Sequence, residues 1–154
     1  IAVGLPEEAA LEQAFDYYDA VTKEDIVKVD SVKRTSERAQ RLMRAYARHQ
    51  GTQASIATLR EDLKNNDSAT LDDNTISSYL DALRKIFVVE DLPAWNPNLR
   101  SKTAIRTADT RYFVDPSIAT AALGLGPEDL INDLKTMGFF LPVVRQPSAN
   151  LHGR

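Results

Sequence analysis

The hydrophobic positions in the first half of the chain repeat at helical spacing. Apolar residues recur three or four positions apart within 35–49, 53–64 and 71–85, and this period predicts three amphipathic helices. Gly51 follows the first of these segments, and the polar run 65–68 follows the second, so both have end signals typical of helices. The pattern therefore predicts three consecutive short helices, each with one buried face.

Flanking helices are predicted on both sides of this group. Residues 6–20 carry an apolar stripe behind a proline in the first turn, and the segment 26–32 either extends that helix or forms a linker. Near the other end, a short helix is predicted for 116–123 and a further helix for 128–137, each beginning at or beside a proline.

The period changes after the third helix. Residues 86–92 and 111–115 are rich in β-branched and aromatic side chains, which predicts two strands joined by a long polar, basic connection. Three helices followed by a strand, a basic loop and a returning strand is the order of a winged helix-turn-helix. We therefore predict a mainly α fold, in which a winged helix-turn-helix of three helices and a two-stranded wing has N-terminal and C-terminal flanking helices.

Three regions follow from this prediction. They are an N-terminal helical linker segment (1–34), the winged helix-turn-helix (35–115), and C-terminal helices with an irregular tail (116–154). The first residue is Ile rather than Met, so we expect the natural chain to begin earlier.

Composition narrows the class of protein. Hydrophobic residues make up 43% of the chain and charged residues 27%, which is typical of a globular protein. Cysteine is absent, the first 19 residues lack the basic start of a signal peptide, and no apolar run is long enough to span a bilayer. We expect a cytoplasmic protein with no membrane partner.

Charge is uneven along the chain, although its net value is only −3. The predicted wing, 100–111, holds four cations and one acid, whereas the exposed side of the third helix carries several acids beside Ser and Thr. Phosphate contacts need cations, and base edges are read by hydrogen-bonding side chains. The candidate nucleic-acid or partner contacts are Arg100, Lys102, Arg106, Arg111, Thr75, Ser78 and Arg84.

A second group of cations has two open interpretations. Arg41, Arg44 and Arg48 share one face of their predicted helix, where they could track phosphates or pair with the acidic N-terminal helix. For His49, close to the end of the same helix, we expect compensation of the helix dipole.

Other conspicuous residues have structural interpretations. Trp95 between prolines is expected to pack under the wing rather than anchor a partner, and Asp115-Pro116 is expected to start a helix. Glu24 and Asp25 lack the further ligands that a metal ion requires, so we expect a surface or capping role for them.

No catalytic constellation is present in the sequence. It contains no GxxxxGK[ST] phosphate-binding loop, no cysteine nucleophile and no metal-ligand set. We therefore expect that the chain is not an enzyme by itself and holds no cofactor.

Several short motifs resemble a known family. They are Tyr79-Leu80-Asp81-Ala82-Leu83, Leu92-Pro93-Ala94-Trp95, Asn98-Leu99-Arg100-Ser101-Lys102 and Tyr112-Phe113-Val114-Asp115-Pro116. With these motifs the chain resembles the domain of unknown function that follows the nucleotide-binding core in a group of bacterial and archaeal AAA-superfamily ATPases. The resemblance implies an upstream ATPase core, which would be the part that binds ATP and Mg²⁺.

Two functional hypotheses remain from the sequence. The first is a non-catalytic accessory or regulatory module of an AAA-superfamily ATPase, which docks on the ATPase core or on a protein partner. The alternative is a DNA-binding winged-helix module that contacts phosphates through its basic wing. The acids of the third helix and the negative total charge favour docking, whereas the basic wing favours DNA.

Overall fold

The first helix is longer than its apolar stripe predicts. The structure is a computed structural model that describes residues 7–93, 109–126 and 128–129. Helix α1 (Glu7–Ala20) continues through a π-helical turn, η1 (Val21–Asp25), into the short helix α2 (Ile26–Lys28). The hydroxyl of Thr22 donates to the carbonyl of Tyr18 at 3.0 Å within this wider turn. The helical alternative for the segment after residue 25 is thus correct as far as Lys28.

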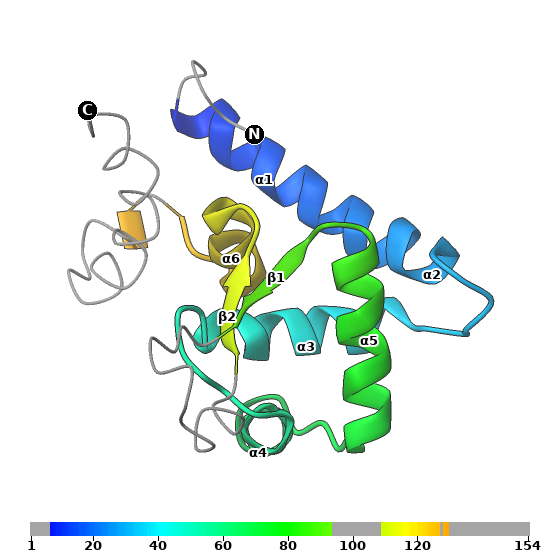
Figure 1. The fold of residues 1–154 in the computed structure, drawn as a ribbon. Coiled ribbons are helices and arrows are strands. Elements are labelled where there is room, and N and C mark those ends of the chain that lie inside the picture. The colour runs from blue at the N-terminus through cyan, green and yellow to red at the C-terminus, as the bar shows by residue number, and fades with distance from the viewer. Residues whose placement is uncertain (1–6, 94–108, 127, 130–154) are drawn as a thin grey trace, which may run out of the picture.

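Three capped helices follow, and the prediction of a helical trio is confirmed (Figure 1). They are α3 (Ser36–Arg48), α4 (Ile56–Asn66) and α5 (Asp73–Lys85). The side chains of Thr35, Ser55 and Asp72 each accept a hydrogen bond from the backbone N–H three residues later. These caps satisfy N–H groups that the first turn of a helix leaves free, and they explain where each helix begins.

The predicted two-stranded ribbon is also confirmed. Strands β1 (Val89–Leu92) and β2 (Thr110–Phe113) pair antiparallel, with Val89 opposite Phe113 and Asp91 opposite Arg111. On the far side of β2, the N–H of Gly51 donates to the carbonyl of Arg111 at 2.7 Å. The N–H of Arg111 in turn donates to the carbonyl of Thr52 at 2.9 Å. Strand β2 therefore lies between β1 and the segment after α3, and β1 is the outer strand.

Strand β1 begins three residues later than predicted, because residues 86–88 end helix α5 instead. The N–H of Phe87 donates to the carbonyl of Arg84 at 3.0 Å, and the N–H of Val88 donates to that of Leu83 at 2.9 Å. This pair of bonds is the Schellman motif, in which the residue after the helix adopts a left-handed conformation. Phe87 takes that position with φ of 58°, where Gly is the common choice.

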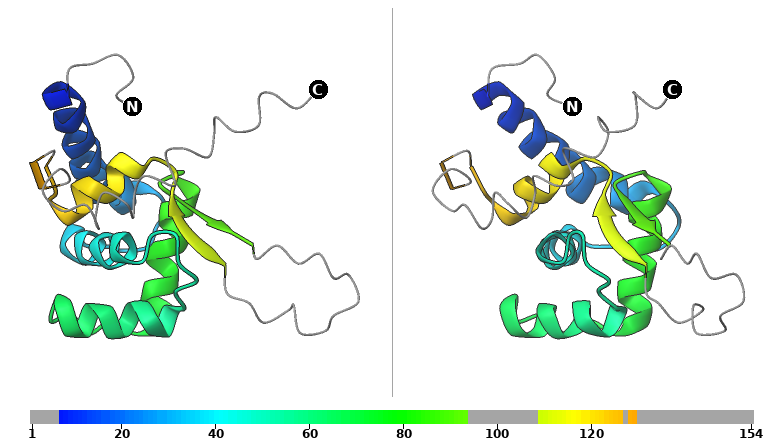
Figure 2. Two further views of the ribbon diagram at one scale, coloured as in Figure 1. Left: turned by 90° about the vertical axis from the view of Figure 1, so that its left-hand side faces the viewer. Right: turned by 60° about the vertical axis from the view of Figure 1, so that its left-hand side comes forward.

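The fold is closed by α6 (Pro116–Leu123), which packs against both α1 and α3 (Figure 2). Asp115 caps α6 by accepting from the N–H of Ser117 at 2.8 Å, and Gly124 ends it with φ of 69°. The helix-starting role expected for Asp115-Pro116 is confirmed. Of the predicted helix 128–137, only residues 128–129 are described, and they are helical.

One hydrophobic core joins the N-terminal helix to the rest of the described chain. Ala14, Tyr18, Val21 and Ile26 are buried in the same cluster as the inward faces of α3, α5 and α6. Tyr46 lies within this cluster, and its ring meets Phe113 edge-to-face with centroids 5.1 Å apart. The segment predicted to be a helical linker, residues 1–34, therefore contributes buried side chains to the common core.

Candidate functional site

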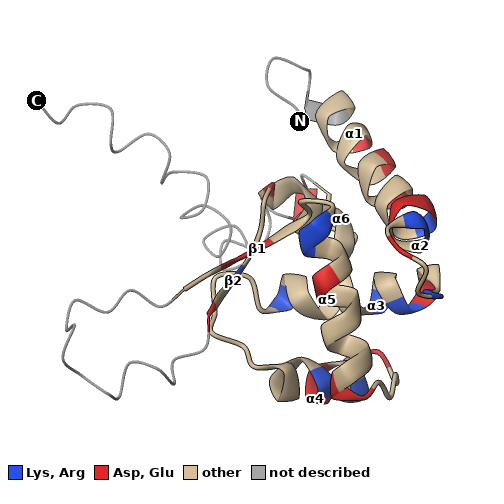
Figure 3. Ribbon diagram, turned by 45° about the vertical axis from the view of Figure 1, so that its right-hand side comes forward, with Lys and Arg blue, Asp and Glu red and all other residues tan. Residues whose placement is uncertain are grey.

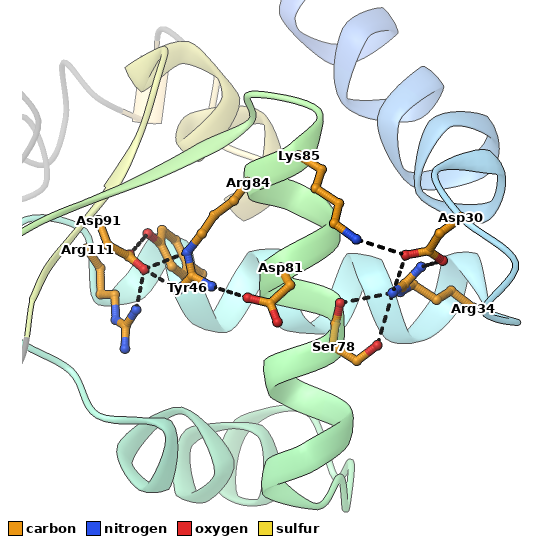
Figure 4. A network of polar contacts seen from close by, with 9 residues as sticks. All are labelled: Asp30, Arg34, Tyr46, Ser78, Asp81, Arg84, Lys85, Asp91 and Arg111. Atoms are coloured by element: carbon orange, nitrogen blue, oxygen red, sulfur yellow. Dashed lines mark hydrogen bonds and ion pairs between the residues drawn. The ribbon is translucent and has the colours of Figure 1, made fainter.

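The exposed side of α5 is the surface from which a winged helix-turn-helix would read DNA, so its side chains decide what it can bind. Asp72, Asp73 and Asn74 are exposed at its start, and Asp81 is exposed near its end. Two polar clusters lie one on each side of α5, and they include its residues Ser78, Asp81, Arg84 and Lys85 (Figure 4).

The first cluster surrounds Asp91 of β1, whose side chain is only 6% exposed. Its carboxylate accepts from the hydroxyl of Tyr46 at 2.8 Å and from Nη1 of Arg111 at 2.6 Å. Arg84 of α5 also donates to it, from Nε at 2.9 Å and from Nη2, while its Nη1 contacts Asp81 at 2.7 Å. Burial, followed by the charge and hydrogen bond of Asp91, raises the pKa of Tyr46 far above its ordinary value.

Arg111 was a candidate contact residue of the predicted wing, but its side chain lies in the interior. Its side chain is only 9% exposed, and Nε donates to the carbonyl of Ala54 at 2.9 Å. Together with the bond to Asp91, these contacts tie β2 to β1 and to the segment before α4. The structure thus places Arg111, a candidate nucleic-acid or partner contact, inside the fold, where its guanidinium is held by these partners.

The second cluster fixes the turn before α3 to the other side of α5. Arg34 is buried, and its guanidinium makes paired contacts with Asp30 at 2.6 and 3.2 Å. Its Nη2 also donates to the backbone carbonyl and the hydroxyl of Ser78, at 3.1 and 3.0 Å. The hydrogen bond from Arg34 is the largest cause that lowers the pKa of Asp30 to about 2. Lys85 lies 3.5 Å from the same carboxylate.

These contacts limit how far the three candidate residues on α5 are available to a nucleic acid or a partner. Ser78 and Arg84 are half-buried and already hold Arg34, Asp81 and Asp91. Thr75 is half-buried as well, and its backbone N–H donates to the carboxylate of Asp72 at 2.6 Å. Sequence reasoning missed Arg34 and Asp91, since neither belongs to a recognisable motif.

The arginine stripe on α3 pairs with acids of the same helix and of α4. Arg44 contacts Asp67 at 3.0 Å, and Arg48 contacts both Asp62 and Asp67. Arg41 contacts Glu37 one turn earlier, at 2.5 Å. Of the two open interpretations, pairing with the acidic N-terminal helix is not what these contacts show, because Glu37 of α3 and the acids at and after the end of α4 occupy this face instead.

The remaining candidates have simpler placements. His49 ends α3, and its Nε2 lies 3.0 Å from Asp62, while Glu24 pairs with Lys28 on the surface. Across the described residues, no group of three or more His, Asp or Glu side chains is arranged to hold a metal ion. The wing residues Arg100, Lys102 and Arg106, together with Trp95, lie outside the described residues.

The fold and this surface define a mainly helical domain with a small antiparallel ribbon, compatible with the winged-helix class. The chain belongs to the family described as "Domain of unknown function (DUF8612)", whose model matches residues 4–129. No curated protein and no solved structure matches the chain. Within the part of the chain that is described, no helix is long and apolar enough to cross a membrane.

Proposed function

We propose that this chain is a non-catalytic docking module that binds a protein surface. The sequence resemblance to the domain beside an AAA-superfamily ATPase core makes such a core the proposed surface. The parent protein would then supply ATP hydrolysis, while this chain contributes binding or regulation and holds no cofactor.

The observation that carries this proposal is that the cations on α5 lie in ion pairs with acids of the same chain. Arg84 is paired with Asp81 and Asp91, and Lys85 lies beside Asp30. A helix that enters the major groove approaches phosphates on both sides, which favours free cations and disfavours carboxylates. Asp72 and Asp73 at the start of the same helix are exposed, and Asp73 pairs with Arg60 at 2.7 Å, so this end of the helix adds no free positive charge for a polyanion. Acidic and basic positions lie together along α5 (Figure 3). A basic or neutral protein surface suits this face better.

DNA binding through the wing is the second candidate. It rests on the sequence cations Arg100, Lys102 and Arg106 and on the winged-helix-like order of elements. The wing would contact phosphates and would bind different sequences alike.

A fluorescence-anisotropy titration with duplex DNA separates the two candidates. At physiological salt, we expect the dissociation constant to be weaker than about 10⁻⁴ M, the weak end of non-specific binding. Micromolar affinity that is lost on changing Arg100, Lys102 and Arg106 together to Ala would overturn the docking proposal. In that case, the triple variant should also flatten the dependence of log affinity on log salt by roughly two to three units.

A charge-reversal pair tests docking directly. Changing Asp73 and Asp81 to Lys is expected to weaken binding of the chain to the ATPase core, mainly by slowing association. Glu12 and Asp16, exposed on α1, provide a matched control pair with the same change in net charge. Equal effects of the two pairs, measured by surface plasmon resonance, would argue that the outer face of α5 is not the docking surface.

A further inference from the structure

Four side chains of alternating charge lead from the outer face of α5 into the ribbon. They are Asp81, Arg84, Asp91 and Arg111, and they are called the charge chain below. Each contacts the next, with 2.7 Å between the first two and 2.6 Å between the last two. The side chain of Asp81 is 63% exposed, whereas that of Asp91 is 6% exposed. The charge chain therefore joins a surface acid to a buried one.

Arg84 divides its guanidinium between the two acids (Figure 4). Its Nη1 donates to Asp81 at 2.7 Å, while its Nε donates to Oδ2 of Asp91 at 2.9 Å and its Nη2 contacts the same oxygen. The five N–H donors of a guanidinium point in fixed directions from one plane, so this group cannot turn toward one acid without a change at the other. The two acids thus share one rigid cation.

Asp91 is the point where this sharing reaches the ribbon. Besides Arg84 of α5, its carboxylate binds the hydroxyl of Tyr46 from α3 at 2.8 Å and Nη1 of Arg111 from β2 at 2.6 Å. A buried charge interacts more strongly with its partners than an exposed one, because less water screens it. The hold of Arg84 on Asp91 therefore contributes to how firmly β1 is fixed to α5.

We propose that the charge chain is a conformational relay, in which a cationic group of a docked protein partner binds Asp81, turns Arg84 toward Asp91 and fixes the ribbon more firmly to α5. The inference rests on the proposed docking function for its trigger and adds a consequence of docking. A cation on Asp81 favours the arrangement in which that acid has released Arg84, and a ligand shifts an equilibrium toward the state it prefers. An ion-pair network with two arrangements is a physical route for such coupling.

Asp81→Asn tests the relay in the chain alone. This variant removes the negative charge of Asp81, as pairing with a partner's cation would neutralise it. The measurement is amide hydrogen exchange, followed by NMR, because exchange rates report how often a region opens. We expect the ribbon to exchange about two- to fivefold more slowly in the variant, the range that a partly exposed ion pair supplies.

Two amides report on the ribbon. The N–H of Val114 donates to the carbonyl of Val88 at 3.1 Å, and the N–H of Arg111 donates to that of Thr52 at 2.9 Å. The N–H of Leu59, which donates within α4, is the internal reference for opening of the whole fold. An equal change at the reference would show altered global stability and would overturn the relay, as would ribbon exchange that is unchanged or faster.

Asp73→Asn is the matched control. Asp73 is exposed on the same helix and pairs with Arg60 at 2.7 Å, so its substitution changes the net charge equally without touching the charge chain. We expect ribbon exchange in this variant to match wild type. Slowing equal to that in Asp81→Asn would show an effect of net charge and would overturn the relay.

A double variant tests the route through Arg84. Arg84→Gln removes the guanidinium that joins the two acids, so adding Asp81→Asn to it should no longer slow ribbon exchange. Slowing that persists in the double variant would overturn the assigned route. The comparison of Asp81→Asn with Asp73→Asn decides the proposal even where Arg84→Gln is too unstable to measure.

A last measurement adds the partner and separates this inference from the docking proposal. Binding of the ATPase core to wild type should slow exchange at Arg111 and Val114, and binding to Asp81→Asn should slow it less. Binding that leaves both amides unchanged would overturn the relay while docking stands. Absence of binding would overturn docking, and the partner-free comparison would still decide whether Asp81 and the ribbon are coupled.

Discussion

Single residues in this chain have effects that depend on distant partners. Asp91 is a buried carboxylate that two arginines and one tyrosine contact, each from a different element: Arg84 from α5, Arg111 from β2 and Tyr46 from α3. Buried charges are tolerated only when they are paired and hydrogen-bonded, so removal of one partner is costly.

Arg111→Met tests this cluster. We expect the free energy of unfolding to fall by about 3 kcal/mol, near the lower end for a broken buried pair, since Arg84 and Tyr46 still contact Asp91. Arg41→Met removes the more exposed pair with Glu37 and should cost less than about 1 kcal/mol in urea denaturation. Similar losses for both variants would show that Asp91 does not depend on Arg111.

Phe87 allows a test of backbone strain. At its left-handed position, Phe87→Gly should leave the protein about 1 kcal/mol more stable than Phe87→Ala, because only Ala keeps the steric cost of a Cβ. Glu61, exposed within α4, is the control, where Ala should be the more stable by a similar amount. The same preference at both positions, measured by thermal unfolding, would contradict the strain at Phe87.

Asp30 makes stability depend on pH in the acid range. Its pKa is lowered to about 2 in the folded chain from an ordinary value of 3.8, chiefly by the hydrogen bond from Arg34. Its contribution is therefore fully present above pH 3.8 and is lost as the pH falls through 2. We expect the stability difference between wild type and Asp30→Asn to shrink over this window in urea titrations. A difference that does not vary with pH would rule out this linkage.

At the scale of single elements, the helices begin where short polar side chains can cap them. Asp72→Ala should lower the free energy of unfolding by about 1 kcal/mol, because it frees the N–H of Thr75 at the start of α5. Asp73 is the matched control one residue later, since it pairs with Arg60 on the surface and caps no backbone group in the described contacts. Asp73→Ala should lower the free energy of unfolding by less than Asp72→Ala in the same chemical denaturation. A larger loss for Asp73→Ala would show that Asp72 is not the residue that caps α5.

At the scale of the whole molecule, α1 and α6 cover the helical trio. Both helices place side chains in the common core, including Ala14 and Tyr18 from the first and Ile118 and Ala122 from the second. Exposure of this apolar surface would leave the central region without a large part of its hydrophobic stabilisation.

A truncation experiment tests this dependence. A chain limited to 35–115, the winged helix-turn-helix as predicted from sequence, should lack a cooperative unfolding transition in calorimetry. A chain of 7–126, which keeps α1 and α6, should unfold cooperatively like the full chain. A cooperative transition in the shorter chain would show that the predicted boundaries define an independent domain.

Periodicity and capping signals were sufficient to predict the helices and the ribbon, because these elements depend on residues a few positions apart. The end of α5 shows the limit of this reasoning. Ile86-Phe87-Val88 has strand composition, but bonds back into α5 make it the end of that helix. β-Propensity reflects packing more than backbone preference, so composition alone could not place the boundary.

Tertiary structure alone decided which charges are available. Arg111 and Arg84 looked like contact residues in the sequence, yet Asp91 lies between their guanidinium groups, and Ser78 is held by Arg34 from 44 residues away. Ion pairs and strand pairing join residues far apart in the chain, and local patterns contain no information about such neighbours.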